Sequence, residues 1–289
     1  MPEHCLIAID LGASNGRTVV GRFDGSVLRI EVAHRFGHLL QEEGGRRRWD
    51  WPTIADGVRK GLVAACERIG DAPLKGVSCC AWAQDFGLLD KSGNLFYSPV
   101  SYRDHRTDGL PEGFSDIISP RALQQRVGSA VASMTTLCQL RAMAEQEPEA
   151  LERATHLLWV ADLVHHMLCG EAATDWTLAT VSQLRNVGSG LWDRDLLDRL
   201  GIPTHMLPPI YSTPAILGRV SRERAPHAKL AGVPVVAGVG HDTSAASAAL
   251  APLKRGDLYL SAGTWTMLGA CTGEFALPDR PESTSVVAM

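Results

Sequence analysis

Apolar and polar positions follow two different periods in the first part of the chain. Residues 5–10 and 17–23 are short apolar runs, and residues 26–36 alternate between apolar and polar side chains. This spacing predicts three successive strands joined by tight turns. Across residues 51–69 the apolar side chains recur every three or four positions after an early proline, which predicts a helix. Residues 74–85 then return to a mostly apolar strand.

The order strand, strand, strand, helix, strand is typical of an α/β fold with a mixed sheet. Residues 119–170 are mainly helical in pattern, and residues 201–232 are rich in Pro and Gly, which predicts a long surface connection. Residues 233–240 form a buried-strand pattern that passes directly into a helical one. Residues 257–271 repeat the design of the first hairpin, so we expect an internal duplication of a βββαβ unit whose second copy is incomplete.

Composition narrows the class of protein and its partners. The chain has 289 residues, of which 45% are hydrophobic and 21% charged, as in soluble globular proteins with more than one folding unit. Its net charge of −4 offers no basic surface for nucleic acid or an anionic membrane, and no apolar run is long enough to span a bilayer. The seven cysteines include no CxxC pair, which favours reduced thiols in a cytoplasmic protein. We therefore expect neither nucleic acid nor membrane among its partners.

The first candidate site is the segment "DLGASNGR", where Asp10 ends an apolar run and small residues follow. Small residues let backbone N–H groups approach an anion closely, so the segment could hold a phosphate. It is neither a Walker loop nor a GxGxxG motif. Asn15-Gly16 is also a strong signal for a type I′ hairpin turn, so the segment by itself leaves a plain surface hairpin open.

Two further segments carry candidate chemistry. In "GVGHDTSAA", Asp242 lies where a strand passes into a helix, the usual place for reactive groups in open α/β sheets. Aspartate is also a favoured helix cap, which is the alternative interpretation of Asp242. The turn "SAGTWTMLG" could supply a second phosphate cradle, although small residues are common in any hairpin turn.

Together these segments resemble the FGGY carbohydrate kinases of the actin-like, ribonuclease-H-like ATPase superfamily, and among them most closely the L-rhamnulokinases. The similar stretches occur in the same order along the chain: "DLGASNGR", "WAQDFGLLD", "SYRDHRTDG", "TDWTLATVSQLRNV", "GHDTSAA" and "SAGTW". The resemblance implies an actin-like α/β fold with a mixed five-stranded sheet and helices on both faces. It also implies a sugar- and phosphate-binding lobe over residues 1–245 and the incomplete beginning of a nucleotide-binding lobe over residues 246–289.

The resemblance further implies ATP-dependent phosphorylation of a ketose or a related small sugar. Asp242 would be the general base on a sugar hydroxyl, and Asp10 would hold Mg²⁺ through water. The residues that would contact the ATP phosphates are Ala13, Ser14, Asn15, Gly16, Arg17 and Thr264. Those that would contact the sugar are Ala83, Gln84, Asp85, Arg103, His241, Asp242 and Thr243. Trp82, Asp104 and Arg106 are further candidates for the sugar site. Two alternatives stay open: Arg17 as the start of an exposed strand, and His241 as a residue that only orients Asp242.

Two departures from the resemblance limit what it implies. L-Rhamnulokinases usually carry Gly in place of Ala83 and an apolar residue in place of Gln84, which leaves the identity of the ketose open. The Gly-rich adenosine-binding segment of the second lobe has no counterpart in these residues. A non-catalytic sugar-binding module, a decayed kinase fragment and an actin-like phosphohydrolase are therefore alternatives to the kinase.

Overall fold

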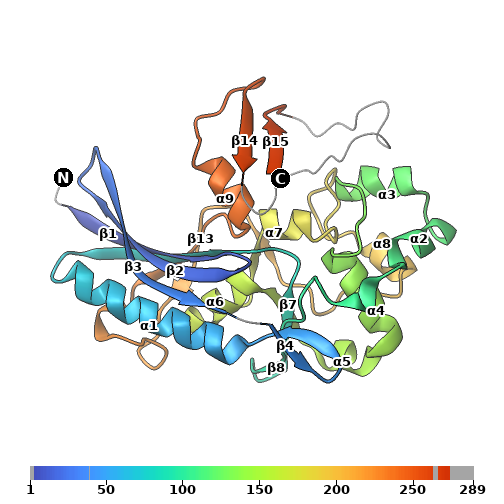
Figure 1. The fold of residues 1–289 in the computed structure, drawn as a ribbon, viewed down its shortest axis with the longest axis horizontal. Coiled ribbons are helices and arrows are strands. Elements are labelled where there is room, and N and C mark those ends of the chain that lie inside the picture. The colour runs from blue at the N-terminus through green and yellow to red at the C-terminus, as the bar shows by residue number, and fades with distance from the viewer. Residues whose placement is uncertain (1–2, 39, 263–265, 274–289) are drawn as a thin grey trace.

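A mixed six-stranded sheet forms the centre of the computed structural model, which describes residues 3–38, 40–262 and 266–273 (Figure 1). The strand order is β12-β13-β6-β1-β2-β3. The six strands are β1 (His4–Leu11), β2 (Asn15–Phe23), β3 (Leu28–Gly37), β6 (Leu74–Ala81), β12 (Ala215–Arg219) and β13 (Pro234–Ala237). Strands β1, β6 and β13 run parallel, and the other neighbouring pairs are antiparallel. The carboxyl ends of these three parallel strands therefore meet at one edge of the sheet.

The sheet has one strand more than the five expected. The additional strand, β12, pairs antiparallel with β13 and lies within the segment for which the Pro and Gly content predicts a surface connection. As an edge strand it buries little side-chain surface, and Ile216 is 67% exposed. Without a buried face, β12 needs no apolar alternation, so the sequence carries no strand signal there.

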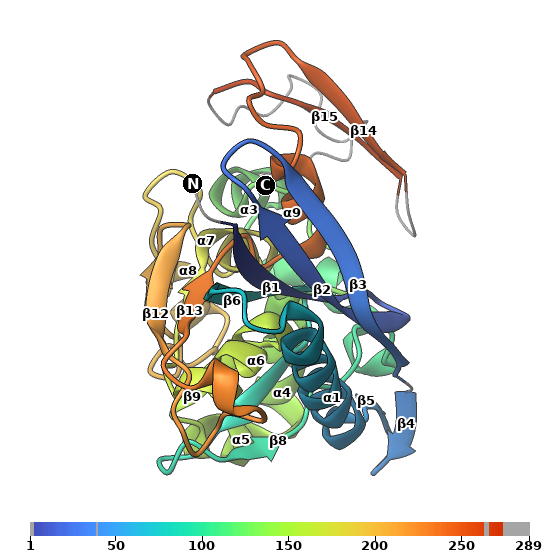
Figure 2. The ribbon, with the colours of Figure 1, turned by 90° about the vertical axis from the view of Figure 1, so that its left-hand side faces the viewer.

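Two helices cover one face of the sheet, and a third lies on the other side (Figures 1 and 2). Helix α1 (Trp51–Ile69) packs mainly on β2 and β3, and α6 (Val160–Cys169) packs on β6, β12 and β13. Helix α9 (Asp242–Ala248) lies beyond the opposite face, next to β6. The mixed sheet with helices on both faces is thus confirmed. Helix α9 is short, so part of the sheet face that it covers stays exposed, as at Leu6 and Ala8 of β1.

Helix α1 follows its sequence pattern closely. Asp50 caps it, because the Asp50 carboxylate accepts the backbone N–H of Thr53 at 3.1 Å. The apolar residues that recur along the segment are the ones it buries: Ile54, Val58, Leu62, Ala65 and Ile69. The helix ends at Gly70, whose φ of 57° suits a residue without a side chain.

The remaining elements form an insert between β6 and β13 and two outlying hairpins. The first hairpin is β4 (Leu40–Glu43) with β5 (Arg46–Trp49), and the last is β14 (Leu258–Ala262) with β15 (Thr266–Ala270). The strands of the insert are β7 (Phe86–Leu89), β8 (Leu95–Tyr97), β9 (His156–Trp159), β10 (Thr174–Asp175) and β11 (Ile210–Tyr211). Its helices are α2 (Leu110–Gly113), α3 (Pro120–Val127), α4 (Thr136–Gln146), α5 (Pro148–Arg153), α7 (Trp176–Val181) and α8 (Arg194–Arg199), with short 3₁₀ turns at His105–Thr107, Phe114–Asp116 and Ala228–Leu230.

One apolar core joins the sheet to the insert. It runs from Ile7 and Ile9 of β1 through Trp159, the largest fully buried side chain, to Leu196 in α8. The hairpin β14–β15 differs, because Leu258, Leu260 and Leu268 are each more than 60% exposed. Helix α9 runs across the lobe boundary expected at residue 245. No helix among the described residues is long and apolar enough to cross a membrane.

Candidate functional site

The candidate site forms where β1, β6 and β13 end side by side. The backbone N–H of Trp82 donates to the carbonyl of Leu11 at 2.8 Å, and that of Ala81 donates to the carbonyl of Gly240 at 2.8 Å. These bonds join the segments that follow the three strands. Segments 12–14, 82–85 and 240–243 therefore gather at one edge of the sheet, where α/β proteins commonly bind ligands.

The hairpin between β1 and β2 turns at residues 12–14. The backbone N–H of Gly12 donates to the carbonyl of Asn15 at 3.0 Å. The prediction of a type I′ turn at Asn15-Gly16 is wrong: both residues belong to β2, where they pair with Gly37 and Phe36, and neither has a positive φ. The small residues of the turn proper are thus Gly12, Ala13 and Ser14.

The packing of Phe36 against Gly16 leaves no space for a side chain at position 16. A Cβ at Gly16 would lie 2.3 Å from Cζ of the Phe36 ring, and a Cβ at Gly57 on α1 would lie 2.3 Å from the same ring. Phe36 thus fills the space between β2 and α1, against two residues that have no side chain. This contact fixes the base of the hairpin next to Asp10.

Asp10 and Arg17 form an ion pair across the hairpin. They are opposite one another in the β1–β2 register, and Arg17 Nε donates to Asp10 Oδ2 at 2.6 Å. On the other side, the Cys80 thiol lies 3.8 Å from Asp10 Oδ1, and burial and the Asp10 charge raise the pKa of Cys80, which keeps that thiol protonated. Arg17 therefore both belongs to β2 and contacts the predicted metal-holding carboxylate.

Asp242 is the first residue of α9, and its carboxyl group is half-buried. Thr243 donates its backbone N–H (2.6 Å) and its hydroxyl (3.1 Å) to Asp242 Oδ1. Burial raises the pKa of Asp242, the bonds from Thr243 oppose this rise, and the charge of Asp10 adds to it. The cap position of α9 belongs to His241, so the interpretation of Asp242 as the cap residue does not hold.

His241 is a neutral neighbour of Asp242. Its Nδ1 lies 2.8 Å from the Ser244 hydroxyl, and its Nε2 lies 3.6 Å from Asp242 Oδ1. Burial lowers the pKa of His241 to about 4, so at neutral pH this is a contact between an uncharged ring and a carboxyl group rather than an ion pair. At 3.6 Å the ring lies beside the carboxyl group without a hydrogen bond to it.

Asp85 is fully buried and bonded within the protein. Its Oδ2 accepts the indole N–H groups of Trp49 (2.6 Å) and Trp82 (3.0 Å), and its Oδ1 accepts Gln139 Nε2 at 3.2 Å. Burial nevertheless raises the pKa of Asp85 to about 7. Its carboxylate thus anchors two tryptophans behind the predicted sugar segment.

Gln84 has a φ of 80°, unusual for a residue with a side chain. Its amide Nε2 donates to the carbonyl of Val181 at 3.1 Å, and its Oε1 accepts the N–H of Thr136 at 3.0 Å. The amide therefore ties α7 to the start of α4. Ala83, between Gln84 and Trp82, stays partly exposed at the strand end.

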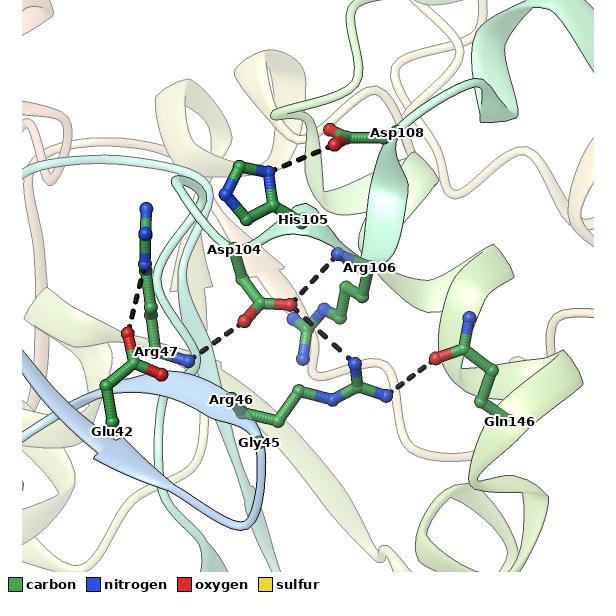
Figure 3. A pocket seen from close by; sticks show the side chains of 9 residues that line it. All are labelled: Glu42, Gly45, Arg46, Arg47, Asp104, His105, Arg106, Asp108 and Gln146. Atoms are coloured by element: carbon green, nitrogen blue, oxygen red, sulfur yellow. Dashed lines mark hydrogen bonds and ion pairs between the residues drawn. The ribbon is translucent and has the colours of Figure 1, made fainter.

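The Arg103 guanidinium lies over the ring of its neighbour Tyr102, 5.2 Å from the ring centroid. The following segment lines a pocket of about 480 Å³ (Figure 3). Asp104 accepts the backbone N–H groups of Arg47 (2.9 Å) and Arg106 (3.0 Å), and the Arg47 guanidinium pairs with Glu42 at 3.1 Å. Figure 3 also shows Arg46 directed at Asp104. Two of the candidate sugar contacts, Asp104 and Arg106, are among its nine lining residues. Segments 12–14, 82–85 and 240–243 contribute none, so this pocket is separate from the junction of strand ends.

Several residues of the site were not among the predicted contacts. His38 Nε2 donates to the carbonyl of Gly12 at 2.9 Å, and its ring packs against Trp82 with centroids 5.1 Å apart. Asp175 and Thr177 contact the segment before Asp242. Each bonds to a partner far away in the chain, so a local pattern could not assign its role. The resemblance covered Asp175 and Thr177, in "TDWTLATVSQLRNV", but gave them no role. Thr264, the last predicted phosphate contact, lies outside the described residues.

The site can accommodate a hydrated Mg²⁺. No group of three or more His, Cys, Asp or Glu side chains in the described ranges could hold a metal ion by itself. Magnesium commonly binds through one or two carboxylates and keeps several waters, and Asp10 offers one carboxylate that is 27% exposed. The donor set therefore fits a weakly ligated, hydrated Mg²⁺ beside Asp10.

Known sequences match most of the chain. Residues 5–249 match the N-terminal domain of the FGGY family of carbohydrate kinases. A rhamnulokinase of Pectobacterium atrosepticum is 34% identical over 267 residues, covering 91% of this chain and 52% of that protein. One of Yersinia pestis (strain Pestoides F) is 36% identical over 272 residues, covering 93% and 54%. The chain thus spans about half the length of these curated relatives.

Solved structures share the fold. A xyloylose kinase from Brucella ovis has a TM-score of 0.82 at 21% identity, covering 97% of this chain and 57% of that one. A gluconate kinase from Lactobacillus acidophilus has a TM-score of 0.81 at 18% identity, covering 92% and 54%. These similarities confirm the actin-like α/β fold expected from the sequence.

Proposed function

Because the chain belongs to the FGGY family of carbohydrate kinases, we propose that it takes part in the ATP-dependent phosphorylation of a small sugar. The observation that supports this most is the junction of three parallel strand ends. There a half-buried Asp242 of raised pKa lies close enough to Asp10 to be affected by its charge. Phosphoryl transfer needs a base on the attacking hydroxyl and a metal-holding carboxylate, and this junction supplies a candidate for each.

Asp242 would accept the proton of the attacking sugar hydroxyl. A general base of this kind contributes roughly 10²–10⁴ in rate, and its efficiency rises as its pKa approaches the working pH. Burial moves the pKa of Asp242 in that direction. Thr243 donates its backbone N–H to Asp242 Oδ1, and Nε2 of the neutral His241 ring lies 3.6 Å from the same oxygen.

Asp10 would hold Mg²⁺ through water, and that ion would neutralise negative charge on the ATP phosphates. The Arg17 guanidinium, which is bonded to Asp10 across the hairpin, would contact a phosphate. The remaining contacts proposed for the phosphates are Ala13, Ser14, Asn15, Gly16 and Thr264.

We propose a ketose resembling rhamnulose as the sugar, since the curated relatives are named rhamnulokinases. We propose Ala83, His241 and Thr243 as direct contacts, because each is partly exposed at the junction of strand ends. Gln84 and Asp85 would shape the sugar site from within, because their polar atoms already bond to the protein. Arg103, whose guanidinium lies over the Tyr102 ring, is a further proposed contact.

We also propose that residues 1–245 are the sugar- and phosphate-binding lobe and that residues 246–289 begin a nucleotide-binding lobe. The family match over residues 5–249 supports the first part. The exposed leucines of β14 and β15 support the second, because such side chains are typical of a hairpin that packs against further structure.

The test is ADP formation by the purified chain with ATP, Mg²⁺ and a panel of ketoses. We expect ADP release that depends on the ketose and is abolished in Asp242→Asn. Asp56→Asn, on the surface of α1, is the matched control and should keep full activity. Release independent of sugar would favour a phosphohydrolase. A thermal shift with sugar but none with ATP and Mg²⁺ would favour a binding module or an inactive fragment.

A further inference from the structure

We infer that Asp175 and Thr177 are positioning residues that hold the backbone segment carrying Asp242. This inference rests on the proposed function, since it takes Asp242 to be the base. The two residues end β10 and begin α7, more than sixty positions before Asp242 in the chain. They meet the segment at residues 240–241, directly before the proposed base.

Asp175 bonds both to the first turn of α7 and to segment 240–243, which carries Asp242. The side chain is 2% exposed. Its Oδ1 accepts the backbone N–H (2.7 Å) and the hydroxyl (2.5 Å) of Thr177, so it caps α7. Its Oδ2 accepts the backbone N–H of Gly240 at 3.2 Å. One buried carboxylate thus links the start of a helix to the end of the segment that follows β13.

Thr177 extends the same connection by one residue. Its hydroxyl donates to Asp175 and accepts the backbone N–H of His241 at 3.3 Å. Two consecutive N–H groups before Asp242 are therefore held by Asp175 and Thr177, at the junction of β10 and α7. From the opposite side, the carbonyl of Gly240 accepts the N–H of Ala81 in β6. The segment is clamped between a helix and the central sheet.

The fit around Gly240 leaves no space for a side chain. A Cβ there would lie 2.3 Å from Asp175 Oδ2 and 2.8 Å from Leu178 Cδ1. The glycine thus permits the close approach that the bond from its N–H requires. A glycine at position 240 therefore lets segment 240–243 lie close to the start of α7.

The bonds from Asp175 and Thr177 to residues 240–241, here called the clamp, would affect the reaction by fixing the position of Asp242. A base must lie within hydrogen-bond reach of the hydroxyl it deprotonates, and a displacement of about 1 Å can cost about 10²-fold in rate. Neither Asp175 nor Thr177 needs to touch the sugar for this effect. Loss of the clamp should therefore lower kcat while leaving the KM for sugar nearly unchanged.

The matched variants are Thr177→Val and Thr177→Ser. Valine keeps the shape of the side chain and removes its hydroxyl, whereas serine keeps the hydroxyl. In the full chain, Thr177→Val should lower kcat about 10- to 100-fold, with KM for the ketose within about threefold of the parent. Thr177→Ser should stay close to the parent. Asp175→Asn, which cannot accept at both oxygens, should resemble Thr177→Val.

Amide hydrogen exchange at Gly240 and His241 is the second readout. We expect the His241 amide to lose protection in Thr177→Val and to keep it in Thr177→Ser. Equal kcat in the valine, serine and parent chains would overturn the inference, as would retained protection at His241 in Thr177→Val. A fall of kcat shared equally by both variants would also overturn it, since the hydroxyl would then not be the cause.

These outcomes separate the clamp from the proposed function. A parent chain that forms no ADP with any ketose would overturn the kinase activity. Hydrogen exchange at His241 would still decide whether the Thr177 hydroxyl holds the segment. An active parent with an unaffected Thr177→Val would overturn only the positioning role.

Discussion

Replacement of Gly16 by alanine tests why a glycine stands in the first hairpin. The Cβ of alanine would lie 2.3 Å from Cζ of Phe36, well inside van der Waals contact. The ring cannot simply retreat, because Gly57 of α1 approaches its other edge and His34 stacks on it at 5.9 Å. Overpacking of this kind costs about 1–3 kcal/mol, so Gly16→Ala should lower the free energy of unfolding by about 2 kcal/mol.

A smaller side chain at position 36 should remove the clash. In the Phe36→Leu background, Gly16→Ala should cost less than about 0.5 kcal/mol, which gives a coupling energy of about 1.5 kcal/mol between the two sites. Urea unfolding followed by tryptophan fluorescence, on the parent, both single variants and the double variant, measures this cycle. The two Phe36→Leu chains are the matched controls for any cavity left by leucine.

The competing explanation is that Gly16 is needed for the approach of phosphate. It predicts unchanged stability and weaker binding of ATP and Mg²⁺ in Gly16→Ala, regardless of the residue at position 36. If Gly16→Ala unfolds at the parent's urea concentration, or if Phe36→Leu fails to rescue it, the packing explanation is refuted.

Two further predictions concern buried polar groups. Because burial raises the pKa of Asp85 to about 7, the folded chain keeps a proton there that the unfolded chain releases above its ordinary value of 3.8. As the pH rises from 3.8 to about 7, the free energy of unfolding, relative to Asp85→Asn, should fall by about 1.4 kcal/mol per pH unit, and above pH 7 it should stay level. A difference between the two chains that does not change with pH in urea unfolding would contradict this. His165 Nε2 accepts the backbone N–H of Cys79 at 3.0 Å, so His165→Phe should lower the free energy of unfolding by about 1–3 kcal/mol through an unpaired buried donor. His165→Gln, which retains an acceptor, should lose less, and equal losses in the two variants would argue against the bond.

Local sequence determined those parts of the fold in which neighbouring residues satisfy one another. Helix α1 is an example, because Asp50 caps it, its apolar residues recur at helical spacing, and Gly70 ends it. The passage from β13 into α9, which carries Asp242, is equally local. The order of these segments was sufficient to indicate the family.

Tertiary structure alone decided how the site is built. Asn15-Gly16 has the sequence of a turn, but pairing with β3 and the Phe36 ring place both residues in a strand. Edge strand β12 buries too little side-chain surface to leave a pattern. The Asp175 carboxylate accepts an N–H 65 residues away, and nothing in its own neighbourhood specifies that partner. Periodicity and capping reveal contacts within a few residues, whereas buried polar groups bond to whichever donors the completed fold brings to them.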